Sequence, residues 1–181
     1  GRGLEPLDIQ KIHSMVGFAC EGLSNVSESQ VEMNSGLQFY DGMTTDEIQQ
    51  ILIKSANDLI TLENPNYQYV AARLLLFSLR KSLLHKLWDH PSVKDHVNKC
   101  IDLGVYDKEI VNWYDEDELD QMNGYIKHDR DYLFSYAGMR QVIDKYLVQD
   151  RSNGQIFETP QFMYMMIAAT LFADYPKKKR I

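Results

Sequence analysis

The sequence predicts a mainly α-helical protein: four helices with the remnant of a strand or hairpin at the front, then a helical region with one short β-hairpin. Three observations support this prediction. Apolar residues recur at helical spacing through most of the 181 residues. Between Tyr69 and Leu79 the chain is apolar on nearly every side, as in a fully buried helix. Asn153-Gly154 lies between two short extended runs and is typical of a hairpin turn.

The front of the chain, residues 1–10, shows a short apolar alternation, which we interpret as the second half of a strand pair. Asp8 is a good N-cap for the helix that follows, and Gly22 suits the end of that helix. Its apolar face is predicted to contain Ile12, Met15, Val16, Phe18, Ala19 and Leu23.

A second helix is predicted from Ser27 to Phe39, with its apolar side chains turned inward. These are Val31, Leu37 and Phe39. A turn at Tyr40-Asp41-Gly42 follows.

The third helix begins at a capping box, in which the side chains of Thr44 and Glu47 bond each other's backbone N–H groups. Its spacing predicts a buried face made of Ile48, Ile51, Leu52, Ala56, Leu59 and Ile60.

The fourth helix occupies Asn64–Lys81 and organises the front half of the chain. It opens on the turn-like Asn64-Pro65-Asn66 and is predicted to end on Arg80-Lys81, where cations suit the negative end of a helix. We interpret Arg73 as a buried structural ion-pair partner. For Lys81 two interpretations stay open: a solvated last-turn lysine, or a charge aimed at an anion.

The second half starts after Asp89-His90-Pro91 and alternates short helices with turns. The residues from Leu147 to Glu158 predict a hairpin with a two-residue type I′ turn at Asn153-Gly154. Thr159 caps and Pro160 opens a last helix, whose methionines and Phe172 we expect in the core. The other predicted helices are Ser92–Leu103 ending at Gly104, Asp107–Tyr114, Glu116–Ile126 and Phe134–Tyr146.

Composition excludes several classes of function. Hydrophobic residues make up 44% and charged residues 25%, which suits a globular protein with a packed core. The net charge of −7 argues against nucleic-acid and membrane-surface binding. No apolar run is long enough to span a bilayer, and we see no signal peptide. We expect the basic run near residue 177 to begin the next element of a longer protein.

The potential metal and thiol ligands form no recognisable motif. Cys20 and Cys100 are far apart and make no CxxC pair, so we expect reduced thiols in a cytoplasmic protein. His85, His90 and His96 lack zinc spacing, and we interpret them as scattered surface histidines. There is also no phosphate-binding glycine loop of the GxxxxGK[ST] or GxGxxG kind. The residues alone therefore predict neither a catalytic nor a metal site.

Three segments, LEPLDIQKIH, FYDGMTTDEI and NPNYQYVAARLLLFSLRK, resemble the ATP-cone, a regulatory nucleotide-binding domain found at the front of many ribonucleotide reductase large subunits. Two more, IKHDRDYLFSYAGMRQVIDKYLVQ and GQIFETPQFMYMMIAATLF, resemble the helical region that follows the cone in the class I large subunit. The resemblance implies an ATP-cone over residues 1–84 and this helical region over residues 85–181.

The resemblance also implies a function, that of the allosteric front of a ribonucleoside-diphosphate reductase. ATP would activate and dATP would inhibit an oxidoreductase that makes deoxyribonucleotides for DNA replication. Its implied partners are the remainder of the large subunit with its catalytic barrel, a second large subunit and the radical-bearing small subunit. The family's catalytic cysteines would lie after Ile181, so we expect this chain alone to be inactive.

The resemblance further implies where the nucleotide binds. The segment Glu5–Lys11 would wrap it, with Glu5 and Asp8 near the adenine or sugar and Lys11 at the phosphates. Thr45, at a helix start, and Lys81 would also meet the phosphates, with Mg²⁺ bridging them. Gln49 stands where some relatives have histidine. The full implied set is Glu5, Pro6, Leu7, Asp8, Ile9, Gln10, Lys11, Thr45, Gln49 and Lys81.

Two other interpretations remain. One is a helical interaction domain without a ligand, which a nucleotide-binding measurement would distinguish. The other is an ATP-cone attached to a different host, such as an anaerobic reductase or a transcriptional regulator, which the sequence after Ile181 would distinguish. Under the first of these, Glu5, Asp8 and Lys11 are only a solvated helix start, and Thr45 only assists a cap.

Overall fold

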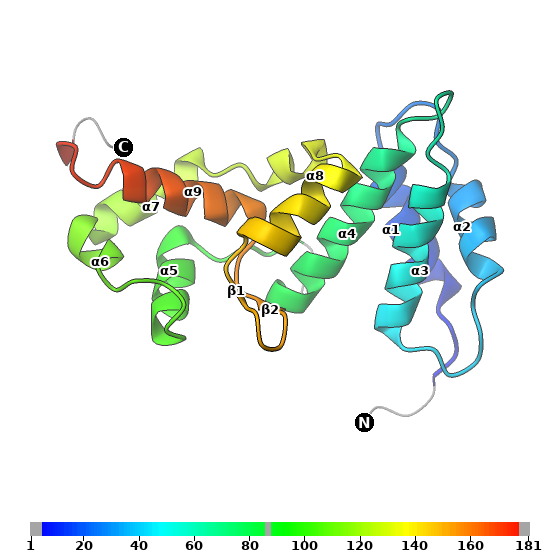
Figure 1. Ribbon diagram of the computed structural model, residues 1–181, viewed down its shortest axis with the longest axis horizontal. Helices are drawn as coiled ribbons and strands as arrows, with labels where there is room; N and C mark the ends of the chain where they lie inside the picture. Colours follow the sequence, from blue (N-terminus) through cyan, green and yellow to red (C-terminus); the bar gives the residue numbers. More distant parts are fainter. Residues whose placement is uncertain (1–4, 86–87, 178–181) are drawn as a thin grey trace. The chain divides into compact units, whose positions relative to one another are not determined.

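The computed structural model describes residues 5–85 and 88–177, and it confirms a mainly helical fold with one short hairpin (Figure 1). The first helices are α1 (Ile9–Cys20), α2 (Glu28–Gly36), α3 (Thr45–Asp58) and α4 (Tyr67–Leu84). The elements that follow are α5 (Val93–Asp102), α6 (Ile110–Trp113), α7 (Glu116–Tyr125), the 3₁₀ helix η1 (His128–Leu133), α8 (Tyr136–Gln141), the π-helical turn η2 (Val142–Tyr146), β1 (Gln149–Asp150), β2 (Gln155–Ile156) and α9 (Pro160–Leu171).

The chain forms two compact units. The first holds the chain up to Ser78 together with Tyr132–Arg140, and the second holds Leu79–Asp131 and the chain from Gln141 onward. Helix α4 contributes to both units, since its first part belongs to one and its last turns to the other. A domain boundary after residue 84 therefore stays a prediction.

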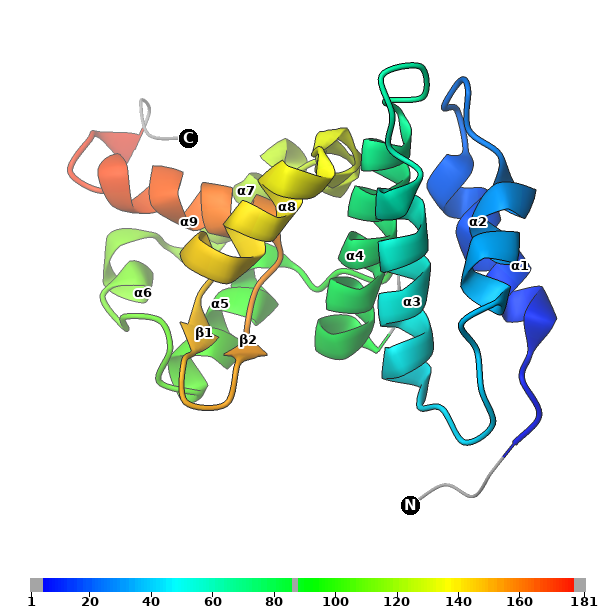
Figure 2. The same cartoon turned by 45° about the vertical axis from the view of Figure 1, so that its right-hand side comes forward.

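The first unit is built from α1 to α4, with α2 packed against both α1 and α3 (Figure 2). The predicted caps are confirmed. The Asp8 carboxylate accepts from the Lys11 N–H, and Thr44 with Glu47 forms the capping box. Gly22 follows α1 with a φ of +70°, a conformation that glycine adopts without strain.

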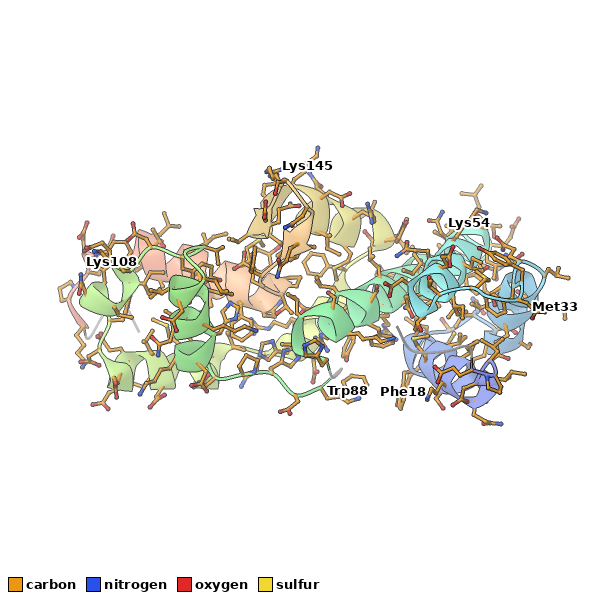
Figure 3. All side chains as sticks on the ribbon, turned by 90° about the horizontal axis from the view of Figure 1, so that it is seen from below. Phe18, Met33, Lys54, Trp88, Lys108 and Lys145 are labelled. Atoms are coloured by element: carbon orange, nitrogen blue, oxygen red, sulfur yellow. The ribbon has the colours of Figure 1, made fainter. Side chains whose placement is uncertain are left out.

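Four expectations for the first unit need correction. Helix α3 ends at Asp58, so Ile60 lies beyond it and is 36% exposed instead of buried. Helix α2 ends at Gly36, so Leu37 falls on the cap and is 83% exposed instead of inward. Phe18 was expected on the apolar face of α1, but it is 49% exposed (Figure 3). Residues 5–8 form no strand in the described part of the chain, and Gly1–Leu4 lie outside the described residues.

Helix α4 is buried through most of its length, as its composition predicts. It extends beyond the expected polar end to Leu84, and Arg80 is only 1% exposed. Arg73 is half-buried, but its guanidinium donates to the carbonyls of Ala19 and Glu21 and lies over the Tyr132 ring. Its described contacts are therefore with carbonyls and a ring, not with a carboxylate.

The second unit has an apolar core in which α9 meets α5, α6 and α7. Tyr114 is buried there, and its hydroxyl donates to the carbonyl of Ala169 at 2.7 Å. The buried members of this core are Val93, Val97, Ile110, Tyr114, Leu119, Met122, Phe162, Met166 and Ala169. The expectation that the methionines of α9 lie in the core holds for Met163 and Met166, whereas Phe172 is 44% exposed at the end of the helix.

The hairpin and the cap of α9 differ from their predictions. Asp150 pairs with Gln155, which leaves a four-residue loop between them. Within it only Gly154 has a positive φ, so the turn is not type I′. Thr159 occupies the N-cap position of α9, but its buried hydroxyl makes no capping hydrogen bond.

The expectation of scattered surface histidines is wrong for His90 and His96, whereas His85 is exposed as expected. His90 and His128 are stacked with ring centroids 3.6 Å apart, and the buried His96 is stacked on Phe162 at 3.9 Å. Burial lowers the pKa of His90 to about 3 and the pKa values of His96 and His128 to about 4. These imidazoles are therefore neutral in the folded protein at neutral pH.

The buried Asp131 has the opposite effect on the pH dependence of stability from the three imidazoles. Burial raises its pKa to about 6, so on acidification the folded protein takes up this proton before the unfolded chain does. The three imidazoles do the reverse: the unfolded chain binds protons below pH 6.5, and the folded unit resists them until about pH 4. Burial also raises the pKa of Glu158, so three imidazoles act against two carboxyl groups in this unit. The free energy of unfolding should therefore fall as the pH decreases from 6.5 to about 4.

Within the described residues, no helix is both long and apolar enough to cross a membrane. Both cysteines are buried and unbridged.

We predict that His90→Phe reduces this acid sensitivity. Both ring nitrogens of His90 lack a hydrogen-bond partner, so phenylalanine keeps the stack and loses no bond. Melting temperatures at pH 7 and pH 4.5 would measure the effect, and the variant should show the smaller loss. His13→Gln is the control, because Glu32 raises the pKa of the exposed His13 and its removal should not reduce the loss. An unchanged loss in His90→Phe would contradict the assignment.

Candidate functional site

The segment Glu5–Lys11 is exposed and leads into α1. Its ordered feature is the cap: the Lys11 N–H donates to Asp8 at 3.1 Å, and the Lys11 ammonium lies 3.3 Å from the same carboxylate. The backbone N–H of Lys11 is the largest cause that lowers the pKa of Asp8. Asp8 and Lys11 are thus brought together, and both stay accessible to solvent.

Thr45 is the first residue of α3 and is exposed. A helix N-terminus presents free N–H groups and positive partial charge. In α3 the Glu47 carboxylate already accepts from the N–H and hydroxyl of Thr44, and these bonds lower its pKa. The first turn also carries Asp46, so an anion bound here would need nearby cations or a bridging metal ion.

Gln49 lies one turn further along α3 and is buried, with 7% of its surface exposed. Its amide nitrogen donates to the carbonyl of Leu74 on α4 at 2.9 Å. This bond satisfies a carbonyl inside the helix packing. Gln49 therefore ties α3 to α4 and has its amide group already engaged.

Lys81 is exposed in the last turn of α4, directly after the buried Arg80. Neighbouring residues on a helix point about 100° apart, so one faces solvent while the other faces the core. Among the expected site residues, Lys11 and Lys81 are the two cations, and both lie on exposed surface.

The starts of α1 and α3 lie at the same end of the first unit (Figures 1 and 2). Glu5–Lys11 and Thr45, from distant parts of the sequence, are therefore presented at one end. Within this unit, α4 runs antiparallel to α3, so its chain direction leads back towards the same end.

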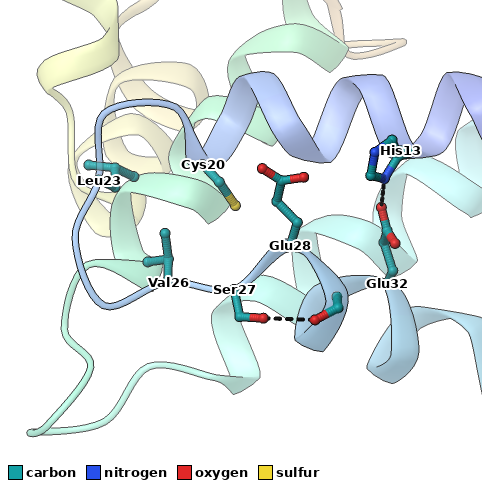
Figure 4. A pocket seen from close by; sticks show the side chains of 8 residues that line it. His13, Cys20, Leu23, Val26, Ser27, Glu28 and Glu32 are labelled. Atoms are coloured by element: carbon teal, nitrogen blue, oxygen red, sulfur yellow. Dashed lines mark hydrogen bonds and ion pairs between the residues drawn. The ribbon is translucent and has the colours of Figure 1, made fainter.

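A separate pocket of about 420 Å³ lies between α1 and α2 (Figure 4). His13 contacts Glu32 at 2.8 Å, and Glu28 and Cys20 face each other further along. None of the expected site residues lines it. Across residues 5–85 and 88–177, no group of three histidine, cysteine or acidic side chains is arranged to hold a metal ion.

The two thiols are poorly suited to chemistry. Burial raises the pKa of Cys20 and of Cys100 to about 11. A thiol with this pKa carries almost no thiolate at neutral pH.

Sequence reasoning missed the buried polar groups Arg80, Asp131, Gln161 and Glu158, which lie outside the expected site. A charged residue inside an otherwise apolar helix was the available signal for Arg80. Nothing in the local sequence identified Asp131 as its partner, because the two are 51 positions apart.

Comparison with protein families divides the chain into two matches. Residues 3–82 match the ATP cone domain. Residues 132–180 match the all-alpha domain of ribonucleotide reductase. The first match contains all three segments that resemble the cone, and the second contains residues 132–149 of one helical-region segment and the whole of the other.

Curated relatives match nearly the whole chain. Ribonucleoside-diphosphate reductase 1 subunit alpha of Escherichia coli (strain K12) is 47% identical over 98% of this chain and 23% of its own length. The subunit alpha of Haemophilus influenzae is 46% identical over the same shares. That of Enterobacteria phage T4 is 43% identical over 95% of this chain and 22% of its own length. The chain thus spans less than a quarter of the length of the relatives it matches.

Proposed function

Because this chain combines an ATP cone with the all-alpha domain of ribonucleotide reductase, we propose that it is the N-terminal regulatory part of a ribonucleoside-diphosphate reductase large subunit. The observation that carries the proposal is the presence of both domains, in this order, in a chain that aligns over 98% of its length with such a subunit at 47% identity. An ATP cone alone would leave the host open.

The ligand that we propose is an adenine nucleotide, ATP as activator and dATP as inhibitor, bound with Mg²⁺. The exposed cations Lys11 and Lys81 suit phosphate oxygens, and Thr45 adds a hydroxyl at a helix start. Mg²⁺ would supply positive charge where the first turn of α3 carries Asp46 and Glu47.

The remaining expected residues have supporting roles in this proposal. Glu5 and Asp8 offer acceptors for the adenine amine or the sugar, and the backbone of Pro6, Leu7, Ile9 and Gln10 forms the wrapping segment. Gln49 fixes α3 against α4, because its amide bonds the Leu74 carbonyl. The engaged capping carboxylate of Asp8 fixes the start of α1.

Regulation then follows from differential binding. A nucleotide shifts an equilibrium between assemblies only by the difference in its affinity for them. We propose that the assemblies involve the remainder of the large subunit with its catalytic barrel, a second large subunit and the radical-bearing small subunit. The whole protein would reduce ribonucleoside diphosphates in the cytoplasm, and this chain would contribute control without catalytic residues.

We predict that the chain binds ATP and dATP with Mg²⁺ and binds GTP much more weakly. The reason is that an acceptor from Glu5 or Asp8 at position 6 of the purine would accept from the amine of adenine and would be repelled by the carbonyl of guanine. Isothermal titration calorimetry with each nucleotide would measure this. Equal affinities for dATP and GTP would refute base reading, and no binding of any nucleotide would refute the proposed function.

Lys81→Ala should weaken dATP binding about ten- to a hundredfold, because a charge-assisted contact contributes about 1.5–3 kcal/mol. The fold should survive, since a last-turn cation adds only about 0.3–1 kcal/mol through the helix dipole. The matched control is Lys108→Ala, which removes another exposed lysine, drawn in Figure 3. Unchanged dATP affinity in Lys81→Ala would exclude the lysine from the site.

Leu75→Ala should act on stability instead. Leu75 is 5% exposed inside α4, and the cavity left by truncation costs about 2–5 kcal/mol. Leu62→Ala is the control, since Leu62 is 98% exposed and its truncation leaves no cavity. Thermal melts would compare the two variants. Equal melting temperatures would contradict the burial of α4.

A further inference from the structure

Three buried polar side chains join α4, η1 and the start of α9 inside the second unit. Nη2 of Arg80 donates to Oδ2 of Asp131 at 3.3 Å and to the backbone carbonyl of His128 at 2.8 Å. Nε2 of Gln161 donates to the other carboxylate oxygen, Oδ1 of Asp131, at 2.9 Å. The Asp131 carboxylate is therefore shared between α4 and α9.

Burial makes this network stiff. Arg80 and Asp131 are each 1% exposed, and Gln161 is 9% exposed. Separating the two buried charges would leave each with a neutral hydrogen-bond partner in place of the opposite charge, the His128 carbonyl for Arg80 and the Gln161 amide for Asp131, which is strongly unfavourable. A displacement of Arg80 is therefore followed by Asp131, and a displacement of Asp131 is followed by Gln161.

The network begins next to the proposed nucleotide ligand. Lys81 lies in the last turn of α4 and directly follows Arg80, so the two share one peptide unit. Lys81 is exposed, whereas Arg80 is fixed in the core. A ligand that restrains the Lys81 side chain therefore restrains the same helical turn that Arg80 anchors.

We propose that Arg80, Asp131 and Gln161 are positioning residues that transmit nucleotide occupancy at Lys81 to η1 and to the first turn of α9. The inference rests on the proposed function, because it requires a nucleotide at Lys81. Coupling of this kind is reciprocal. If the nucleotide changes the affinity of α9 for a partner, that partner changes the affinity for the nucleotide by the same factor. The network thereby connects the ATP cone to the all-alpha domain.

Hydrogen–deuterium exchange with and without ATP and Mg²⁺ tests the proposal on the chain as it is. In the wild type, ATP should slow exchange of the amides in residues 128–133 and 159–166 by about fivefold or more, the low end of typical coupling between sites. Gln161→Met severs only the link to α9, since Arg80 and Asp131 stay paired. It should keep the effect in residues 128–133 and lose it in residues 159–166.

Two further variants keep the result interpretable. Gln161→Asn retains the amide but is too short to reach Asp131, and it should behave like Gln161→Met. Thr170→Val is the matched control on the same helix, because among the described residues the Thr170 hydroxyl donates to the carbonyl of Met166, within α9 itself. It should behave like the wild type. The quantity compared is the change in amide exchange rate that ATP causes in each variant. A merely structural role of Gln161 would not alter that change.

Calorimetric titration of ATP separates the two levels of inference. If ATP binds the wild type but exchange in residues 159–166 does not change, the transmission is refuted and the proposed function stands. The same holds if Gln161→Met and Gln161→Asn retain the full effect there. If ATP does not bind the wild type at all, the proposed function fails, and this inference fails with it.

Discussion

The burial of α4 is the constraint on which the rest of the structure depends. A helix that is apolar on nearly every side must be covered all round, and here the first unit covers its first part and the second unit its last turns. The one strongly polar side chain within its last buried turn, Arg80, needs an internal partner. Asp131 supplies that partner, and the pair fixes where η1 must lie.

Sequence reasoning worked where structure is decided locally. The caps at Asp8 and at Thr44 depend on residues three positions apart, so short patterns identify them. The apolar run of α4 predicts burial because no orientation of the helix would leave it a polar face. The predicted helix at Ser92 and its stop at Gly104 hold for the same local reasons.

Sequence reasoning failed where residues far apart in the chain determine the local structure. Leu37 has an apolar side chain at helical spacing, but α2 ends one residue earlier, so the residue sits on the cap and is exposed. The hairpin loop takes four residues because Asp150 pairs with Gln155, a register that Asn153-Gly154 alone does not define. His96 is buried because Phe162, far along the chain, stacks on it. None of these pairings has a short-range signature.

The candidate site shows both what the sequence can predict and what it cannot. Its residues came from a family resemblance, because a capped, charged helix start is a common feature that carries no ligand by itself. The geometry adds what a pattern cannot: Glu5–Lys11 and Thr45 emerge at one end of the first unit, and Gln49 is occupied in helix packing. The last turn of α4 adds a further contrast, with a solvated lysine beside a buried arginine. Under the proposed function, this adjacency would place the phosphate-binding lysine next to the arginine that holds the buried network.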